Sequence, residues 1–243
     1  MKKTIFVLLC TALLALYGCK EKEPPVTAPI SEVKTETESE PEVSEEVQSE
    51  PEEVPDVSPI AKEHFLEPFD DYSWEREFPI EKVIVHFMSA VVNYPEDPYS
   101  MNLLRNIFVD SGLSVHYIIA RDGTVYCYMP ESRAAWHAGK GTFGGEEKYT
   151  NSMNKYSVGI ELAAIGSEND MVQYMDSQKY NSLDKSLIGF TDAQYESLSA
   201  LIKDICQRND IEFTKENIIG HEEYNPEKSD PGELFDWSRL FGN

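Results

Sequence analysis

The feature that most constrains the fold is a break in composition near residue 60. Residues 20–60 contain no aromatic side chain, thirteen acidic residues, three lysines and seven of the chain's fourteen prolines. Such a segment cannot bury enough apolar surface to offset the conformational entropy that folding would cost it. We therefore expect residues 19–60 to form a disordered, extended tether and residues 61–243 to form the folded part.

The first nineteen residues have the pattern of an export signal. Two lysines precede an apolar run, residues 5–16, which is too short for a comfortable membrane-spanning helix. The run ends in Leu-Tyr-Gly-Cys, which resembles the lipobox of bacterial lipoproteins. This resemblance implies a signal peptide over residues 1–18 and a lipid on Cys19, anchored in the outer membrane or on the outer face of the cytoplasmic membrane. The alternative is an ordinary cleaved signal with an incidental cysteine.

Residues 61–243 have the length of a single domain with a substantial core. The formal net charge of the whole chain is −23. An acidic domain without a basic stripe argues against a nucleic-acid partner, and we expect a monomer. Cys127 and Cys206 either pair in an oxidising envelope or remain two buried free thiols.

Hydrophobic periodicity predicts interleaved strands and helices, and hence an α/β domain with a central sheet flanked by helices. Apolar strands are predicted at 82–87, 156–166 and 217–221, and a hairpin at 114–129 turns at Asp122-Gly123. Helices are predicted at 98–112, with Gly112 as the stop, at 191–209, with Thr191 as the N-cap, and near 235–241. Residues 167–189 are polar and aperiodic and are expected to be a long surface loop.

Three polar side chains stand in or at the end of these apolar strands. His86 and His221 each close a strand, which is where α/β proteins place their sites, although one such histidine by itself is more often structural. Glu161 alternates with Gly159 on one strand face, where the glycine leaves room for another group to approach. A carboxylate there must be paired or have a raised pKa, so the alternative is a buried structural glutamate.

Two imidazoles and one carboxylate are a usual ligand set for a hydrolytic zinc ion whose fourth position is left to water. His86, His221 and Asp230 supply this set, with one Zn²⁺ expected per domain. Glu161 is then the candidate general base that takes a proton from water and returns it to a leaving amine. Lys228, two residues before Asp230 in a proline-rich segment expected to be extended, is the candidate cation for an oxyanion.

A second zinc motif begins at His221 but is not completed. His221-Glu222 matches the start of H-E-x-x-H, but Asn225 occupies the position of the second histidine. The segment is also expected not to be helical, as that motif requires.

Six stretches in this order resemble the type 2 N-acetylmuramoyl-L-alanine amidases, zinc amidases related to phage T7 lysozyme and to peptidoglycan recognition proteins. They are VIVHFMSA, VHYIIARDGTVYCYMP, SRAAWHAG, NKYSVGIEL, FTDAQYESL and GHEEYNPEKSDPGELFDW, which cover most of residues 82–237. The resemblance implies a mixed sheet with helices packed around it and a zinc ion in a surface groove. It also implies hydrolysis of the amide between N-acetylmuramic acid and the L-alanine of the stem peptide in peptidoglycan or muropeptides.

By position, the resemblance gives the same roles to the metal ligands, to Glu161 and to Lys228. Phage-type members have a tyrosine and a cysteine where this chain has Val115 and Asp230. The combination is similar to the bacterial branch that includes anhydromuropeptide amidases and a lipoprotein amidase of the envelope.

The stretch Trp136-His137 is expected to line the groove and contact the substrate. A competing interpretation of the whole chain is a peptidoglycan-binding or sensing lipoprotein with little turnover. It is disfavoured because binding does not require a general base at Glu161. A structural or adhesive surface lipoprotein without a metal is a third interpretation.

Overall fold

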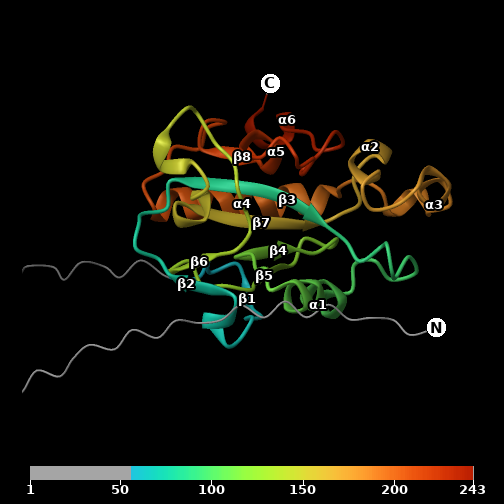
Figure 1. The fold of residues 1–243 in the computed structure, drawn as a ribbon, viewed down its shortest axis with the longest axis horizontal. Coiled ribbons are helices and arrows are strands. Elements are labelled where there is room, and N and C mark those ends of the chain that lie inside the picture. Colours follow the sequence, from blue (N-terminus) through green and yellow to red (C-terminus); the bar gives the residue numbers. More distant parts are fainter. Residues whose placement is uncertain (1–55, 243) are drawn as a thin grey trace, which may run out of the picture. The chain divides into compact units, whose positions relative to one another are not determined.

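The computed structural model describes residues 56–242, and the expected signal peptide, Cys19 and most of the expected tether lie outside them. The described region is built on a six-stranded mixed sheet with the strand order β1-β5-β4-β7-β3-β8 (Figure 1). The adjacent strands β4, β7, β3 and the edge strand β8 are parallel, while β5 runs antiparallel to β4. A small antiparallel pair, β2 and β6, lies apart from this sheet. The predicted α/β class with a mixed central sheet is confirmed.

Strands β3, β4, β5, β7 and β8 form in apolar runs of the sequence, whereas β1 (KE), β2 (SWE) and β6 (RAA) do not. The eight strands are β1 (Lys62–Glu63), β2 (Ser73–Glu75), β3 (Lys82–Met88), β4 (Tyr117–Ile119), β5 (Val125–Cys127), β6 (Arg133–Ala135), β7 (Ser157–Ala163) and β8 (Ile218–Gly220). The hairpin at Asp122-Gly123 joins β4 and β5 as predicted. The last strand, predicted over 217–221, is one residue shorter at each end, because β8 begins at Ile218 and ends at Gly220, where His221 begins a helix.

The helices include two long amphipathic ones, both predicted. They are α1 (Met101–Ser111), α2 (Glu168–Met171), α3 (Ser177–Asn181), α4 (Asp192–Arg208), α5 (His221–Tyr224) and α6 (Ser238–Phe241), with short 3₁₀ turns at Phe69–Asp71, Glu147–Tyr149, Met153–Lys155 and Lys185–Leu187. Thr191 caps α4 through a bond from the Gln194 amide, and Gly112 ends α1 in the left-handed conformation. The expectation that the segment after Gly220 is not helical is wrong, since α5 forms one turn there.

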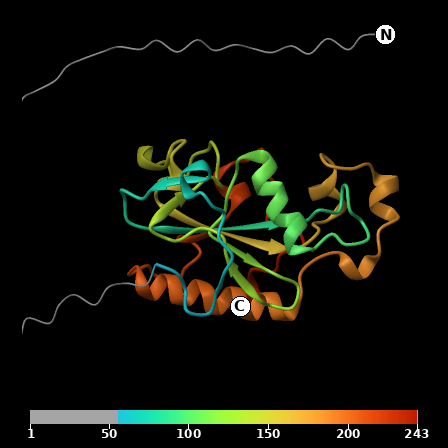
Figure 2. The ribbon, with the colours of Figure 1, turned by 90° about the horizontal axis from the view of Figure 1, so that it is seen from below.

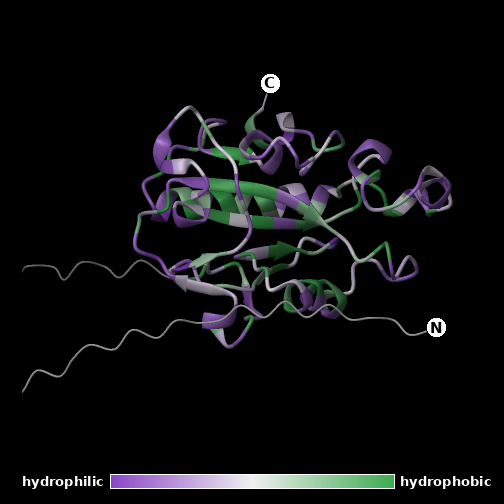
Figure 3. Cartoon of the chain, in the orientation of Figure 1, coloured by the Kyte–Doolittle hydropathy of each residue, from purple (hydrophilic) through white to green (hydrophobic). Residues whose placement is uncertain are grey.

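The sheet separates two apolar layers, and its strands are green with hydrophobic residues in Figure 3. On one face, α4 packs Leu198, Leu201 and Ile202 against the side chains of β3 and β7, as Figure 2 shows for the long helix below the sheet. On the other face, α1 packs Leu104 and Phe108 against β4 and its neighbours. Because side chains alternate along a strand, residues that do not join the α4 layer face α1 and the site.

Residues 167–189 are not the irregular surface loop that the sequence predicts. They contain α2 and α3, and they bury Met171, Met175 and Tyr180 in a separate cluster with Val91 and Ile165. The prediction is wrong because the helices are too short for a helical period to appear in the sequence. Capping supplies the local signal instead, with Ser167 and Asp170 forming a capping box at α2.

The described region begins to make domain contacts before residue 61. Asp56 accepts hydrogen bonds from Ser132, and the Ser58 amide donates to the Tyr117 hydroxyl. The folded part therefore extends five residues into the expected tether. Cys127 and Cys206 are separate buried thiols, and among the described residues no helix has the length and apolarity to cross a membrane.

Candidate metal centre

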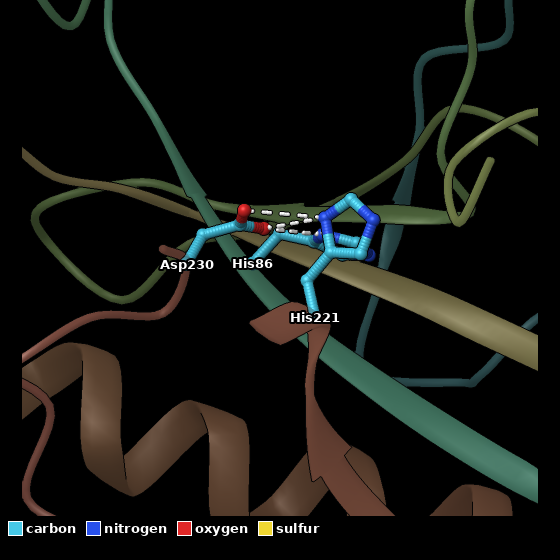
Figure 4. Close-up of side chains that lie close together, drawn as sticks. All are labelled: His86, His221 and Asp230. Atoms are coloured by element: carbon cyan, nitrogen blue, oxygen red, sulfur yellow. Dashed lines mark hydrogen bonds and ion pairs between the residues drawn. The ribbon is translucent and has the colours of Figure 1, made fainter. Parts of the chain in front are cut away.

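The three side chains predicted as metal ligands meet at the carboxyl ends of adjacent parallel strands (Figure 4). His86 comes from β3, and His221 follows β8, whose residue Gly220 pairs with Val85. Asp230 is brought to them by the segment after α5, where its carbonyl accepts from the Glu222 amide at 3.0 Å. The Nδ1 atoms of the two histidines are 3.2 Å apart and lie 2.7 and 3.0 Å from the Asp230 Oδ2 atom.

The other nitrogen of His221 fixes which tautomer the ring adopts. His221 Nε2 lies 2.9 Å from the Ala138 carbonyl oxygen, so it must carry the hydrogen that this acceptor requires. A neutral His221 therefore presents a bare Nδ1 to the Asp230 carboxylate. Two acceptors at this distance need a positive charge between them, which a shared proton or a metal ion can supply.

A chain of hydrogen bonds orients His86 in the same way. Ser157 Oγ donates to the Met153 carbonyl and accepts from His137 Nε2 at 3.2 Å. The bare Nδ1 of His137 then accepts from His86 Nε2 at 3.1 Å, which leaves His86 Nδ1 free to bind. The room that Gly159 was expected to leave is taken by the His137 ring, which would lie 2.6 Å from a Cβ atom there.

The donor set fits a metal ion. Two bare imidazole nitrogens and a carboxylate oxygen lie within 4.8 Å of one another, and each imidazole is held by an outer partner. Burial lowers the pKa of His86 and so favours the neutral ring that a metal needs. Burial opposes ionisation of Asp230, but its contacts with His221 and His86 outweigh this effect and hold its pKa below the ordinary range.

Glu161 lies beside this group, because it pairs in register with His86 across β7 and β3. The residues that alternate with it, Val158, Ile160 and Leu162, join the α4 core as predicted. Its Oε2 atom is buried without a hydrogen-bond partner. Burial, reinforced by the charge of Asp230 and partly offset by Lys228, raises the pKa of Glu161 well above its ordinary value. An orphaned carboxylate of this kind is suited to accept a proton.

Lys228 and Trp136 lie at a pocket of about 160 Å³ on the His221 side of the centre. Lys228 is exposed, and its role beside an oxyanion stays a prediction. Trp136 is 47 % exposed and packs edge-on against Trp74. His137 lines the same pocket, but both of its ring nitrogens bond to protein partners, so its contact with a substrate stays a prediction.

A second pocket, of about 200 Å³, opens on the Asp230 side of the centre. Its walls combine β3, α1 and the segment that contains α2, and they are mostly apolar, formed by Phe87, Met88, Ser89, Val92, Ile107, Met171, Tyr174, Ser229 and Asp230. Burial raises the pKa of Tyr174, and the negative charges of Asp230 and Glu161 add to this effect. The Tyr174 hydroxyl therefore interacts electrostatically with these two site residues.

The supporting residues Ser157, Asp170 and Tyr174 were not predicted from the sequence. Ser157 is one of many serines, and only the fold brings it to His137. Asp170 and Tyr174 lie in the stretch interpreted as a loop, where the Ser167-x-x-Asp170 capping pattern was the available signal.

The family model and the related proteins that the chain matches are all described as amidases. Residues 76–233 match the family model described as N-acetylmuramoyl-L-alanine amidase. The 1,6-anhydro-N-acetylmuramyl-L-alanine amidases AmpD of Enterobacter cloacae and Escherichia coli K12 are 38 % and 33 % identical to the chain, over 53 % of its length in each case. These alignments span 55 % and 56 % of the relatives, so the chain spans about half the length of the curated relatives it matches.

Two solved structures share the fold at 26 % identity. A selenomethionine AmpD derivative superposes with a TM-score of 0.51, covering 76 % of this chain and 94 % of that one. The amidase AmiD of E. coli, solved with the substrate anhydro-N-acetylmuramic acid-L-Ala-D-gamma-Glu-L-Lys, superposes with a TM-score of 0.50, covering 69 % and 57 %.

Proposed function

The chain belongs to the N-acetylmuramoyl-L-alanine amidase family, and from this premise we propose that it hydrolyses the amide between N-acetylmuramic acid and L-alanine in peptidoglycan or its fragments, with zinc as cofactor. The observation that carries the proposal is the convergence of His86, His221 and Asp230 beside an unpartnered Glu161. A protein that only binds cell wall has no use for an orphaned general base.

We propose that His86 Nδ1, His221 Nδ1 and an Asp230 oxygen hold the zinc ion. When bound, zinc polarises the amide carbonyl and makes water acidic enough to ionise near neutral pH. Glu161 takes the proton from the attacking water and delivers it to the departing amine of L-alanine. Lys228 places its ammonium group near the oxygen that becomes negative, which lowers the energy of the tetrahedral intermediate.

The two pockets can accommodate a substrate that carries a sugar on one side of the scissile amide and a peptide on the other. The scissile amide connects a sugar to a peptide, so the substrate must extend to both sides of the metal centre. One pocket lies beside Asp230 and the other beside His221 and Lys228. AmiD was solved with an anhydromuropeptide, and we propose a substrate of the same class for this chain. Trp136 is the proposed stacking surface in the pocket beside His221 and Lys228.

Digestion of purified muropeptides, followed by mass spectrometry, tests this function. We expect release of an intact stem peptide with a free L-alanine amine, and loss of that release when a chelator is present. Binding of muropeptides without release would favour the sensing interpretation. Cleavage at another bond would refute the amidase assignment.

We further propose that the protein is a lipoprotein of the bacterial envelope, anchored through Cys19. The support is the apolar run and the Leu-Tyr-Gly-Cys sequence at residues 16–19, followed by an acidic, proline-rich stretch. Several acyl chains on Cys19 would anchor stably where one would not. Metabolic labelling with a fatty acid should mark the wild type and spare Cys19→Ser, and equal labelling of the two would exclude this anchor.

A further inference from the structure

Asp170 is a buried carboxylate outside the catalytic set, with 4 % of its surface exposed. It belongs to α2, in the stretch between β7 and α4. Its Oδ2 atom accepts from the Ser167 amide at 2.8 Å, which caps α2. The same atom also accepts from the Glu233 amide at 3.3 Å, and this bond reaches the segment that carries the ligand Asp230.

The bonds between α2 and this segment fall on both sides of Asp230. Before it, Ser229 Oγ donates to the Asp170 carbonyl at 3.3 Å, and after it, the Glu233 amide reaches the Asp170 carboxylate. Asn169 adds a bond from its Nδ2 atom to Glu233 Oε1 at 3.1 Å. The metal ligand is therefore the centre of a short loop whose two ends are fastened to one helix.

The space around the carboxylate is shaped to receive it. A Cβ atom at Gly232 would lie 2.4 Å from Asp170 Oδ2, and one at Gly166 would lie 2.7 Å from Asp170 Cβ. Gly232 also has φ +83°, a conformation that other residues rarely adopt. Gly232 allows the close approach between α2 and the Asp230 segment, and Gly166 leaves room for the Asp170 side chain at the start of its own helix.

The helix that provides this attachment is itself fixed. Met171 and Tyr180 are buried against Val91 and Ile165, and the Tyr180 hydroxyl donates to the Gly166 carbonyl at 3.0 Å. A movement of Asp170 would thus require this cluster to open. The position of α2 is set by the core rather than by the site.

We propose that Asp170 is a positioning residue that holds Asp230 at the distance from His86 and His221 that metal binding requires. This inference rests on the proposed zinc site. In metal centres, residues that orient a ligand typically change metal affinity by about 10- to 100-fold when they are replaced. Asp170 acts through the Ser229 hydroxyl and the Glu233 amide, one on each side of the ligand, rather than by touching the carboxylate of Asp230.

The test is zinc affinity of the full-length protein, measured by competition with a chromophoric chelator. We expect Asp170→Ala to raise the zinc dissociation constant about tenfold or more. Asp170→Asn should recover most of the affinity, because its single side-chain oxygen can take the place of Oδ2. The matched control is Asp176→Ala, which removes the N-cap of α3 without touching the Asp230 segment and should leave affinity within about twofold.

The outcomes separate this inference from the proposed function. If the wild type does not bind zinc, both the proposed zinc-dependent function and the role of Asp170 are refuted. Zinc binding by the wild type with unchanged affinity in Asp170→Ala would overturn the role of Asp170 only. If Asp170→Ala does not fold, Ser229→Ala decides, since loss of one bond to the Asp170 carbonyl should raise the dissociation constant about threefold, and no change would overturn the inference.

Discussion

At the scale of single residues, the site depends on side chains whose protonation states are set by burial and by neighbouring groups. Glu161 is a carboxylate with a raised pKa and no partner for Oε2, while Asp230, whose charge contributes to that raised pKa, itself has a lowered pKa. When their surroundings separate the pKa values of two carboxyl groups in this way, the group with the raised pKa is suited to proton transfer and the other to binding.

Replacing Glu161 by Gln should separate binding from catalysis. The amide keeps the shape of the side chain but cannot accept the proton of the attacking water. We expect kcat to fall by about 10²- to 10⁴-fold while zinc content stays at the wild-type level. Steady-state cleavage of a muropeptide and elemental analysis of the same sample measure the two effects. Wild-type turnover in Glu161→Gln would remove this residue from the mechanism.

His116 should make the protein sensitive to mild acid for a structural reason. Its Nδ1 accepts from the Gly159 amide and its Nε2 faces the Arg133 carbonyl, and burial together with the charge of Arg76 lowers its pKa to about 3. In the unfolded chain its pKa is about 6.5. The neutral ring therefore stabilises the fold above pH 6.5, and this contribution is lost as the pH falls from 6.5 toward 3.

Urea unfolding at pH 7.5 and 5.5, with a chelator present, tests this linkage. A histidine that stays neutral in the folded state and is protonated in the unfolded state lowers the free energy of unfolding by about 1.4 kcal/mol for each pH unit below 6.5. His116→Asn keeps an acceptor near Nδ1 and cannot be protonated, so it should lose about 1 kcal/mol less stability between the two pH values than the wild type does. Equal losses in the two proteins would contradict the assignment.

At the scale of elements, the stretch between β7 and α4 is the part of the site that the sequence did not reveal. Its helices are four and five residues long, and they are held by capping and by a local cluster rather than by a long amphipathic face. Strands β3, β4, β5, β7 and β8 and the two long helices were predictable from their apolar patterns, and the helices also have a clear cap or stop, as at Thr191 and Gly112. The short strands β1, β2 and β6 were not predicted. Helices of four or five residues are too short to show a hydrophobic period in the sequence.

This stretch should also control substrate affinity through Tyr174. The residue lines the pocket beside Asp230 and is 51 % exposed, so its ring is available to a ligand. We expect Tyr174→Ala to raise KM about tenfold with a smaller change in kcat, because the contact is made equally in the ground and transition states. Val172→Ala, which changes an exposed side chain that does not line the pocket, is the control. An unchanged KM in Tyr174→Ala would exclude this pocket from substrate binding.

At the scale of the whole molecule, residues distant in sequence become one site because parallel strands end together. His86, Glu161 and His221 were each predicted from their place in an apolar strand, and the structure confirms that β3, β7 and β8 are neighbours. The sequence could not show that His137 faces His86, or that Asp170 fastens the Asp230 loop. These contacts depend on how separate loops pack above the sheet, and no local pattern encodes that packing.

The central claim is that His86, His221 and Asp230 bind one zinc ion through the atoms that now face one another. Anomalous X-ray scattering at the zinc edge, from crystals of the metal-loaded protein, measures this directly. We expect one zinc peak at about 2.0–2.2 Å from both Nδ1 atoms and from an Asp230 oxygen. A zinc ion held by other residues, or coordinated through the Nε2 atoms, would contradict this claim.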